Sequence, residues 1–195
     1  NGVLRVGVIP TIAPYLLPQL VPAIRAAHPQ LRLEVREATT AQLVAALSAN
    51  ELDAFIAAAP IDAPGLSSIP MFEDRFFVAS ASNEQDVLVS PEHGGFPVER
   101  LLLLEEGHCL RDQALTYCNL QKAEAVNTFG ASSLSTIVEM VAADFGITLL
   151  PEICIGVETR GRDIKTIRFL EPEPSRTLGL AWRKSSPRGA DFKAL

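Results

Sequence analysis

Short apolar runs alternate with segments of helical spacing along the first third of the chain. Residues 3–9 form an apolar run that ends at Pro10, and residues 53–59 form another that ends at Pro60, so each predicts a buried strand. Residues 31–36 alternate apolar and polar side chains, which predicts a third strand. Strands separated by helix-length segments imply right-handed βαβ units around a parallel sheet.

The two segments between these strands carry helical patterns. The first has apolar residues at helical spacing, namely Leu16, Leu17, Leu20, Val21, Ile24 and Ala27. Because an interior proline removes a backbone hydrogen bond, Pro14, Pro18 and Pro22 predict a helix with a distorted or late start. The second segment predicts a helix capped by Thr40. Its buried stripe would consist of Leu43, Val44 and Leu47.

Prolines and glycines interrupt this pattern across residues 60–98, where we expect two strands, at 66–72 and 75–80, and a loop over 82–98. The alternation then resumes with a predicted helix over 110–120 and strands at 101–104, 124–129, 147–150, 164–170 and 177–183. A further helix, capped by Ser132 or Ser133 and ended by Gly146, would bury Leu134, Ile137, Val138 and Val141. The repeated pattern, with a break near residue 75, predicts two similar α/β lobes.

The composition restricts the function. A chain of 195 residues can bury a substantial core in one large or two small domains. Its net charge of −6 argues against DNA binding by this part of the protein, because surfaces that neutralise phosphates are basic. No apolar run approaches the length of a membrane span, and residues 1–5 do not resemble a signal peptide. Three cysteines do not form a secreted disulfide framework, so we expect a cytoplasmic protein in which an arbitrary cysteine is a small core residue.

Small polar residues follow the carboxyl ends of the predicted strands. They are Thr11, Thr39, Thr40, the turn at 107–109, Ser132 and Ser133. In open α/β folds, ligands bind in the crevice beyond these strand ends. Hydroxyl groups beside a cysteine suit a compact polar pocket, and the sequence has no glycine-rich phosphate loop, so we expect no cofactor.

The segment 101–118 carries the candidate chemistry. Cys109 follows a predicted strand and lies in the first turn of the predicted helix, where N–H groups and the helix dipole favour a thiolate. A protonated His108 and Arg111 would favour the thiolate further, whereas Asp112 opposes it. The thiolate is the nucleophilic form, so this setting suits reaction with an electrophile such as a peroxide.

Cys118 lies nine residues further on, and we expect it to be buried on the helix face that carries Leu110, Ala114 and Tyr117. Nine helical residues rise roughly 13 Å and turn about 900°, whereas a disulfide needs Cα atoms within about 7 Å. A bond between Cys109 and Cys118 therefore requires the helix to unwind, which is a two-state switch. On spacing alone, the favoured interpretation is that two cysteines nine residues apart in a helix never meet.

Two other chemistries find little support in the sequence. His108, Cys109 and Cys118 lack the close ligand pair of a structural zinc site, so we expect no metal. A Ser-His-Asp hydrolase of the common α/β type would need a G-x-S-x-G elbow, which the sequence lacks.

The run G-H-C-L-R-D-Q-A at 107–114, followed by Cys118, resembles the sensing motif and cysteine spacing of the OxyR family, the peroxide-sensing LysR-type transcription regulators. The resemblance continues at 9–11, 14–18, 37–38, 40, 133–134, 140–143, 146–151, 172–174 and 176–177, with gaps over 60–98 and 152–170. It implies an α/β fold of two Rossmann-like lobes, the type II periplasmic-binding-protein-like regulatory domain. Lobe I would comprise residues 1–75 and 178–195, and lobe II, with the redox cysteines, residues 76–177.

The resemblance also implies roles for individual residues. Cys109 would be the peroxidatic cysteine, oxidised to a sulfenic acid, and Cys118 would be the resolving cysteine that forms a disulfide with it. The peroxide pocket would be lined by Thr11, Thr40, His108, Arg111 and Ser133. The family usually has His and Arg near the positions of Thr128 and Gly130, so that edge of the pocket would differ. Cys154 matches no family role, and we interpret it as buried and inert.

The partners follow from the same resemblance. The small-molecule partner would be hydrogen peroxide, and the regulator would be a homodimer or homotetramer. The family has an amino-terminal winged helix-turn-helix domain, which we expect to be missing from this chain, so DNA would be contacted only through that domain. RNA polymerase is a further candidate partner, and we expect no membrane partner. The chain would end inside a last helix that begins near Pro187.

Three functions are compatible with these observations. The first is a peroxide-sensing regulator, not an enzyme, that switches through a Cys109–Cys118 disulfide. The second is a ligand-sensing regulator or solute-binding protein of the same fold, with a small molecule between the lobes. The third is a thiol peroxidase, for which the sequence indicates no recycling partner.

Overall fold

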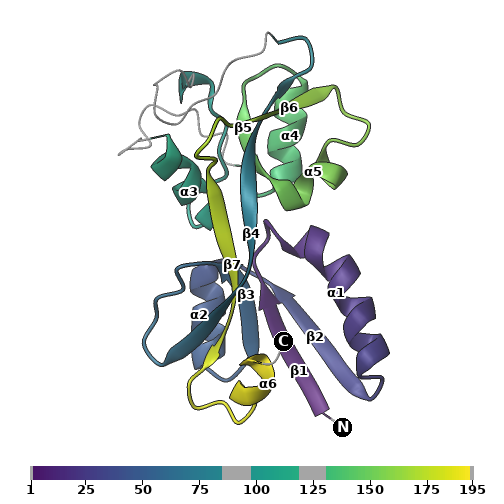
Figure 1. The fold of residues 1–195 in the computed structure, drawn as a ribbon, viewed down its shortest axis with the longest axis vertical. Helices are drawn as coiled ribbons and strands as arrows, with labels where there is room; N and C mark the ends of the chain where they lie inside the picture. Colours follow the sequence, from purple (N-terminus) through teal and green to yellow (C-terminus); the bar gives the residue numbers. More distant parts are fainter. Residues whose placement is uncertain (1, 85–97, 119–130, 194–195) are drawn as a thin grey trace. The chain divides into compact units, whose positions relative to one another are not determined.

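The computed structural model describes residues 2–84, 98–118 and 131–193. The chain divides into two compact units: unit 1 comprises Asn1–Glu73 and Thr177–Leu195, and unit 2 comprises Asp74–Arg176. Strands β4 (Leu66–Ala81) and β7 (Ser175–Arg183) run from one unit into the other (Figure 1). The lobes expected from the sequence break after residues 75 and 177, close to these boundaries. Among the described residues, no helix is long and apolar enough to cross a membrane.

The sheet of unit 1 is built around a central parallel strand. Strand β1 (Gly2–Val8) pairs in parallel with β2 (Leu31–Glu37) and with β3 (Ala54–Ala58), and β7 pairs antiparallel with β3. The order within this unit is β2-β1-β3-β7-β4. Every residue of β3 is buried, as expected for a strand covered on both faces. The three strands predicted in the first third of the chain are therefore confirmed.

Helices α1 (Ala13–Ala27) and α2 (Thr40–Ser48) lie on opposite faces of the β1–β2–β3 sheet (Figure 1). Helix α1 starts at Ala13, so the predicted late start is wrong. The reason is that Pro14 lies in the first turn, where a missing N–H breaks no helical hydrogen bond. Pro18 and Pro22 do lie inside the helix and are exposed. The short helix α6 (Gly189–Lys193) completes unit 1 near the predicted last helix.

The residue that caps α2 is Thr39, not the predicted Thr40. Thr39 has an extended backbone, and its N–H donates to the side-chain oxygen of Gln42 at 3.1 Å. Thr40 is the first helical residue. Either of two adjacent threonines could cap the helix. Gln42 favours Thr39, because a Gln three residues after the cap can accept the N–H of the capping residue. The buried residues of α2 are Leu43, Ala46 and Leu47, whereas Val44 is only half-buried.

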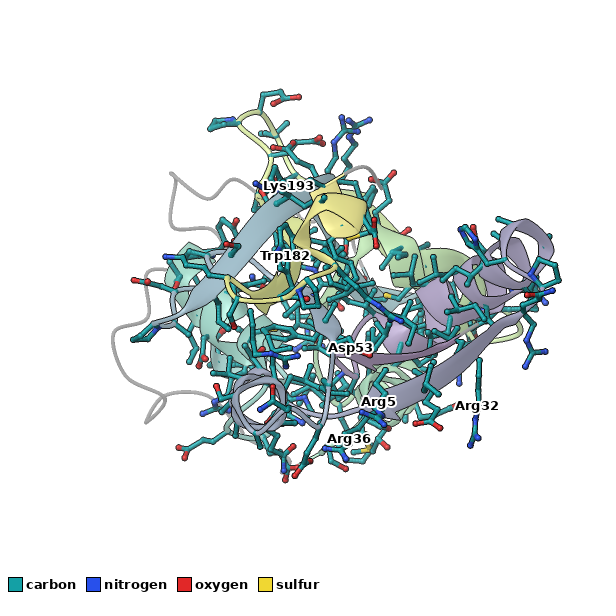
Figure 2. All side chains as sticks on the ribbon, turned by 90° about the horizontal axis from the view of Figure 1, so that it is seen from below. Arg5, Arg32, Arg36, Asp53, Trp182 and Lys193 are labelled. Atoms are coloured by element: carbon teal, nitrogen blue, oxygen red, sulfur yellow. The ribbon has the colours of Figure 1, made fainter. Side chains whose placement is uncertain are left out.

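The face of the β1–β2 pair away from α1 is charged. The parallel register places Arg32, Glu34 and Arg36 on the same face as Arg5. Glu34 lies 3.4 Å from Arg5 and 3.0 Å from Arg32, and Glu51 lies 2.7 Å from Arg36. Figure 2 shows the three arginines on this side of the strands. Each of these arginines thus lies beside a carboxylate, which offsets part of the positive charge of this face.

In unit 2, the second half of β4 pairs antiparallel with β5 (Thr148–Pro151) and with β6 (Ile164–Arg168). Helices α3 (Cys109–Tyr117), α4 (Leu134–Ala142) and α5 (Glu152–Glu158) and the 3-10 turn Val98–Arg100 complete the unit (Figure 1). Helix α4 buries the four predicted residues Leu134, Ile137, Val138 and Val141. Its N-cap is Ser133, one of the two predicted candidates.

Several predicted elements of this region need correction. The two strands at 66–72 and 75–80 are one continuous strand, β4, and the strand at 101–104 reduces to two isolated bridges. Gly146 does not end α4: Asp144 takes the left-handed conformation there, with a φ of 60°. Gly146 is needed for close approach instead, because an added Cβ would lie 2.3 Å from Arg100 O. Helix α5 was not predicted, and the strand at 124–129 and most of the loop at 82–98 lie outside the described residues.

Candidate functional site

Cys109 is the first residue of α3, and the segment before it fixes where that helix begins. Residues 101–104 are buried, and the backbone N–H groups of Leu102 and Glu105 donate to Ile147 O and Ala131 O at 2.8 and 3.0 Å. Gly107 then takes a φ of +93°, a left-handed conformation that favours glycine, and the chain turns into α3. Cys109 itself is only half-buried. A rigid buried segment thus presents a partly exposed thiol at a helix N-terminus.

His108 and Arg111, two of the predicted pocket residues, lie on either side of this thiol in sequence and are buried. His108 is the N-cap of α3, and its carbonyl accepts a hydrogen bond from the N–H of Arg111 at 3.0 Å. The His108 ring lies 4.0 Å from a carboxylate oxygen of Glu105. The Arg111 guanidinium donates to Leu104 O at 3.0 Å, so it ties the first turn of α3 to the buried segment.

Cys118 lies at the opposite end of α3, as its C-cap, and its N–H donates to Ala114 O at 3.0 Å. Both cysteines are thiols in this structure, and they lie at opposite ends of one helix, as the sequence predicts. Cys118 is half-buried rather than fully buried. Burial nevertheless raises the pKa of its thiol to about 11, so the sulfur stays protonated and non-nucleophilic at neutral pH in this position.

The other predicted pocket residues belong to other elements. Ser133 is exposed, and its hydroxyl accepts a hydrogen bond from the N–H of Thr136 at 3.2 Å, which caps α4. Thr11 and Thr40 belong to unit 1, where Thr11 is buried after β1. The hydroxyl of Thr40 is buried, and no hydrogen-bond partner for it is found among the described residues. A pocket that joins these residues to Cys109 stays a prediction, and Thr128 and Gly130 lie outside the described residues.

The third cysteine, Cys154, is fully buried in α5, as predicted. Its thiol donates to Pro151 O at 2.9 Å, and burial raises its pKa far above the usual range. A protonated, buried thiol does not react readily with oxidants. In the part of the chain that the structure describes, no three His, Cys, Asp or Glu side chains are grouped as metal ligands would be.

Residues 1–195 match a family model described as the LysR substrate binding domain. A curated relative, the probable hydrogen peroxide-inducible genes activator of Streptomyces viridosporus, is 42% identical over 208 residues. The match covers 100% of this chain and 64% of that protein. The chain thus spans less than two thirds of the length of this relative.

Two solved structures are similar to the chain over nearly all of its length. The reduced form of the OxyR2 regulatory domain from Vibrio vulnificus has a TM-score of 0.89 at 36% identity, covering 100% of this chain and 92% of that one. An OxyR cysteine-to-serine mutant from Corynebacterium glutamicum with H₂O₂ bound has a TM-score of 0.90 at 31% identity, covering 99% and 62%. The predicted periplasmic-binding-protein-like fold of a LysR-type regulatory domain is confirmed. The chain belongs to the LysR substrate-binding domain family.

Proposed function

We propose that this chain is the regulatory domain of a hydrogen-peroxide-responsive LysR-type transcription regulator, with Cys109 and Cys118 as its redox pair. The observation that carries the proposal is the placement of the two thiols at opposite ends of one short helix. The first thiol is partly exposed, and burial keeps the second protonated. The similarity to a peroxide-inducible activator and to an H₂O₂-bound OxyR supports peroxide as the signal.

The chemistry has two steps. The Cys109 thiolate attacks one oxygen of hydrogen peroxide, so that an S–O bond forms, the O–O bond breaks, and the leaving hydroxide takes a proton to become water. The Cys118 sulfur then attacks the sulfur of the Cys109 sulfenic acid. An S–S bond forms, the S–O bond breaks, and a second water leaves with the proton of the Cys118 thiol. Overall the two thiols lose two electrons to one peroxide.

The second step cannot take place in the helix as it stands. Cys118 follows Cys109 by nine positions along α3, a rise of roughly 13 Å, whereas disulfide-bonded Cα atoms lie within about 7 Å. Helix α3 must therefore unwind before the bond closes. We propose that this unwinding changes the contacts of unit 2 with other copies of the regulator.

The intact regulator would be a homo-oligomer of the cytoplasm, where thiols are kept reduced and the pair can be reset. It would contact DNA through an amino-terminal domain outside this chain, and RNA polymerase is a further proposed partner. It would act by changing shape, not by turning over peroxide as an enzyme.

We propose that Thr11, Thr40, His108, Arg111 and Ser133 line the pocket in which peroxide meets Cys109. Support comes from the burial of His108 and Arg111 beside the thiol and from the buried hydroxyl of Thr40. A buried hydroxyl is costly unless it is hydrogen-bonded. Since no described residue bonds the Thr40 hydroxyl, it is suited to hydrogen-bond a small polar ligand. Such a bond would stabilise the oxygen that leaves as charge builds up on it.

Thiol counting tests the redox pair. Dilute hydrogen peroxide is expected to remove two thiols per chain together, and dithiothreitol should restore both. Cys109→Ser should abolish the response, because the nucleophile is gone. Cys118→Ser should leave a sulfenic acid at Cys109 that dimedone labels, because the resolving sulfur is gone. Mass spectrometry of the digested protein identifies each product.

Cys154→Ser is the matched control for these variants, and it should respond as the wild type does. An intramolecular disulfide in either Cys109→Ser or Cys118→Ser would show that the pair is assigned wrongly. A chain that keeps all three thiols and is stabilised by a small molecule would be a ligand sensor. A chain that consumes many equivalents of peroxide when a reductant is present would be a peroxidase.

The raised pKa of Cys118 predicts how its labelling depends on pH. In reduced Cys109→Ser protein, alkylation of Cys118 by iodoacetamide should accelerate about tenfold per pH unit and level off only near pH 11. The packed thiol keeps its proton up to that pH, whereas an opened one loses it near pH 8.5. The packed end of α3 therefore loses stability relative to the opened end as the pH rises between these values.

The same protein in urea serves as the control, and its labelling should level off near pH 8.5. A folded protein whose profile coincides with the unfolded one would contradict the burial of Cys118.

Removal of the Thr40 hydroxyl tests the pocket. Thr40→Val should slow the reaction of Cys109 with hydrogen peroxide by tenfold or more, because one hydrogen bond to the reacting peroxide is lost. Thr40→Ser keeps the hydroxyl and should react at about the wild-type rate. Stopped-flow measurement of sulfenic acid formation at Cys109 gives both rates. Equal rates for Thr40→Val and wild type would show that the Thr40 hydroxyl does not contact the reacting peroxide.

A further inference from the structure

Tyr117, the last residue of α3 and the neighbour of Cys118, is held from outside the helix. Its phenol hydroxyl donates a hydrogen bond to the backbone carbonyl of Ser175, the first residue of β7. Its ring meets the ring of Phe76 on β4 edge-on, with centroids 5.4 Å apart and an interplanar angle of 62°. Both contacts lie within unit 2. The carboxyl end of α3 is thus joined to two strands through one side chain.

The Phe76 ring that contacts Tyr117 is surrounded by buried, hydrogen-bonded groups. Phe76 is 1% exposed, and its N–H donates to Pro174 O at 2.9 Å. The Arg176 guanidinium lies 5.9 Å from the centroid of the Phe76 ring and donates twice to one carboxylate oxygen of Asp74, at 2.9 and 2.8 Å. The second Asp74 oxygen accepts the N–H of Ile153 at 3.0 Å. Because Phe76, Asp74 and Arg176 are buried and held by these contacts, we expect them to stay in place when Tyr117 moves.

Thr116, the residue before Tyr117, makes no comparable contact outside the helix with any residue that the structure describes. Thr116 is exposed, and its hydroxyl donates to Asp112 O at 2.8 Å, a bond inside α3 itself. Such a bond forms and breaks with the helix, but it does not determine where the helix end lies. A comparison of Thr116 with Tyr117 therefore separates the stability of the helix from the position of its end.

We infer that Tyr117 is a positioning residue that keeps Cys118 away from Cys109 and so sets the balance between the dithiol and the disulfide. The inference rests on the proposed function. Adjacent Cα atoms are about 3.8 Å apart, so with Cys109 in place Cys118 cannot close the separation from roughly 13 Å to about 7 Å unless Tyr117 leaves Ser175 and Phe76. The contacts of Tyr117 therefore exist in the dithiol form and are lost in the disulfide form.

The sign of the effect follows from this difference. Contacts present only in the dithiol form stabilise that form, so Tyr117 makes the pair harder to oxidise. Loss of one typical hydrogen bond should shift the equilibrium toward the disulfide by about threefold to tenfold. For this two-electron couple a tenfold shift lowers the reduction potential by about 30 mV.

The test uses the wild-type chain, Tyr117→Phe and the matched variant Thr116→Val. Each variant removes one hydroxyl from the last turn of α3, but only the Tyr117 hydroxyl bonds outside the helix. Each protein is equilibrated with mixtures of reduced and oxidised glutathione, and mass spectrometry quantifies the Cys109–Cys118 disulfide. Oxidised glutathione takes up two electrons and two protons from the thiols and becomes two reduced glutathiones. Tyr117→Phe should reach half-oxidation at a threefold to tenfold lower oxidising ratio, and Thr116→Val within about twofold of wild type.

Thermal unfolding of both redox forms gives a second measurement. A merely structural role of Tyr117 would lower the melting temperatures of the two forms equally. Tyr117→Phe should lower the melting temperature of the dithiol form and leave that of the disulfide form unchanged, because the hydroxyl bonds Ser175 only in the former. Tyr117→Leu, which also loses the ring contact with Phe76, should enlarge both the redox shift and the difference between the two melting temperatures.

The outcomes separate the two claims. A wild-type chain that forms no Cys109–Cys118 disulfide at any glutathione ratio would overturn the proposed function and the role of Tyr117 with it. Two results would overturn the role of Tyr117 alone, provided that the wild-type chain forms the disulfide. In the first, Tyr117→Phe is half-oxidised at the same glutathione ratio as the wild type. In the second, Thr116→Val shifts that ratio as much as Tyr117→Phe does. Equal loss of stability in both redox forms of Tyr117→Phe would reduce Tyr117 to a structural residue.

Discussion

Helix α3 keeps the two sulfurs of the proposed redox pair apart, because its nine residues span roughly 13 Å. The Cα atoms of a disulfide lie within about 7 Å of each other. Formation of the bond therefore requires the hydrogen bonds of α3 to break. The same separation lets the two thiols differ in the reduced protein. Cys109 is partly exposed at the start of the helix, while burial at the other end raises the pKa of Cys118 to about 11. In the proposed switch, the partly exposed Cys109 meets the oxidant, and Cys118 acts as a nucleophile only after the helix has unwound.

Unit 2 is suited to the unwinding of α3 because the buried segment before the helix and the helix itself are held by different contacts. The segment 101–104 is buried, and the Arg111 guanidinium ties the first turn of α3 to it. A helix of nine residues has little stability of its own, so its tertiary contacts decide whether it stays formed. At the carboxyl end those contacts are the ones that Tyr117 makes with Ser175 and Phe76. A few interactions at each end thus determine the state of the helix.

Periodicity in the sequence predicted most of the strands and the buried face of α4, since these depend on residues close together in the chain. Local choices were harder. Thr39 caps α2 in place of Thr40 because of Gln42, and Gly146 serves close packing against Arg100 rather than a helix end. Cys109 and Cys118 could be singled out because their motif is local, and their roles stay a proposal. The contact between Tyr117 and β7 could not be predicted, because its partner lies 58 residues away and is a backbone carbonyl, which no side-chain pattern records.

Hydrogen–deuterium exchange of the α3 amides, measured in the reduced chain and after peroxide treatment, tests the unwinding most directly. If α3 unwinds, amides at 113–118 should exchange at least tenfold faster once the Cys109–Cys118 disulfide has formed, since their helical acceptors are lost. The buried amides of Val138 and Val141 in α4 should keep their protection in both forms. Unchanged protection of 113–118 in a chain shown by mass spectrometry to carry the disulfide would contradict the account.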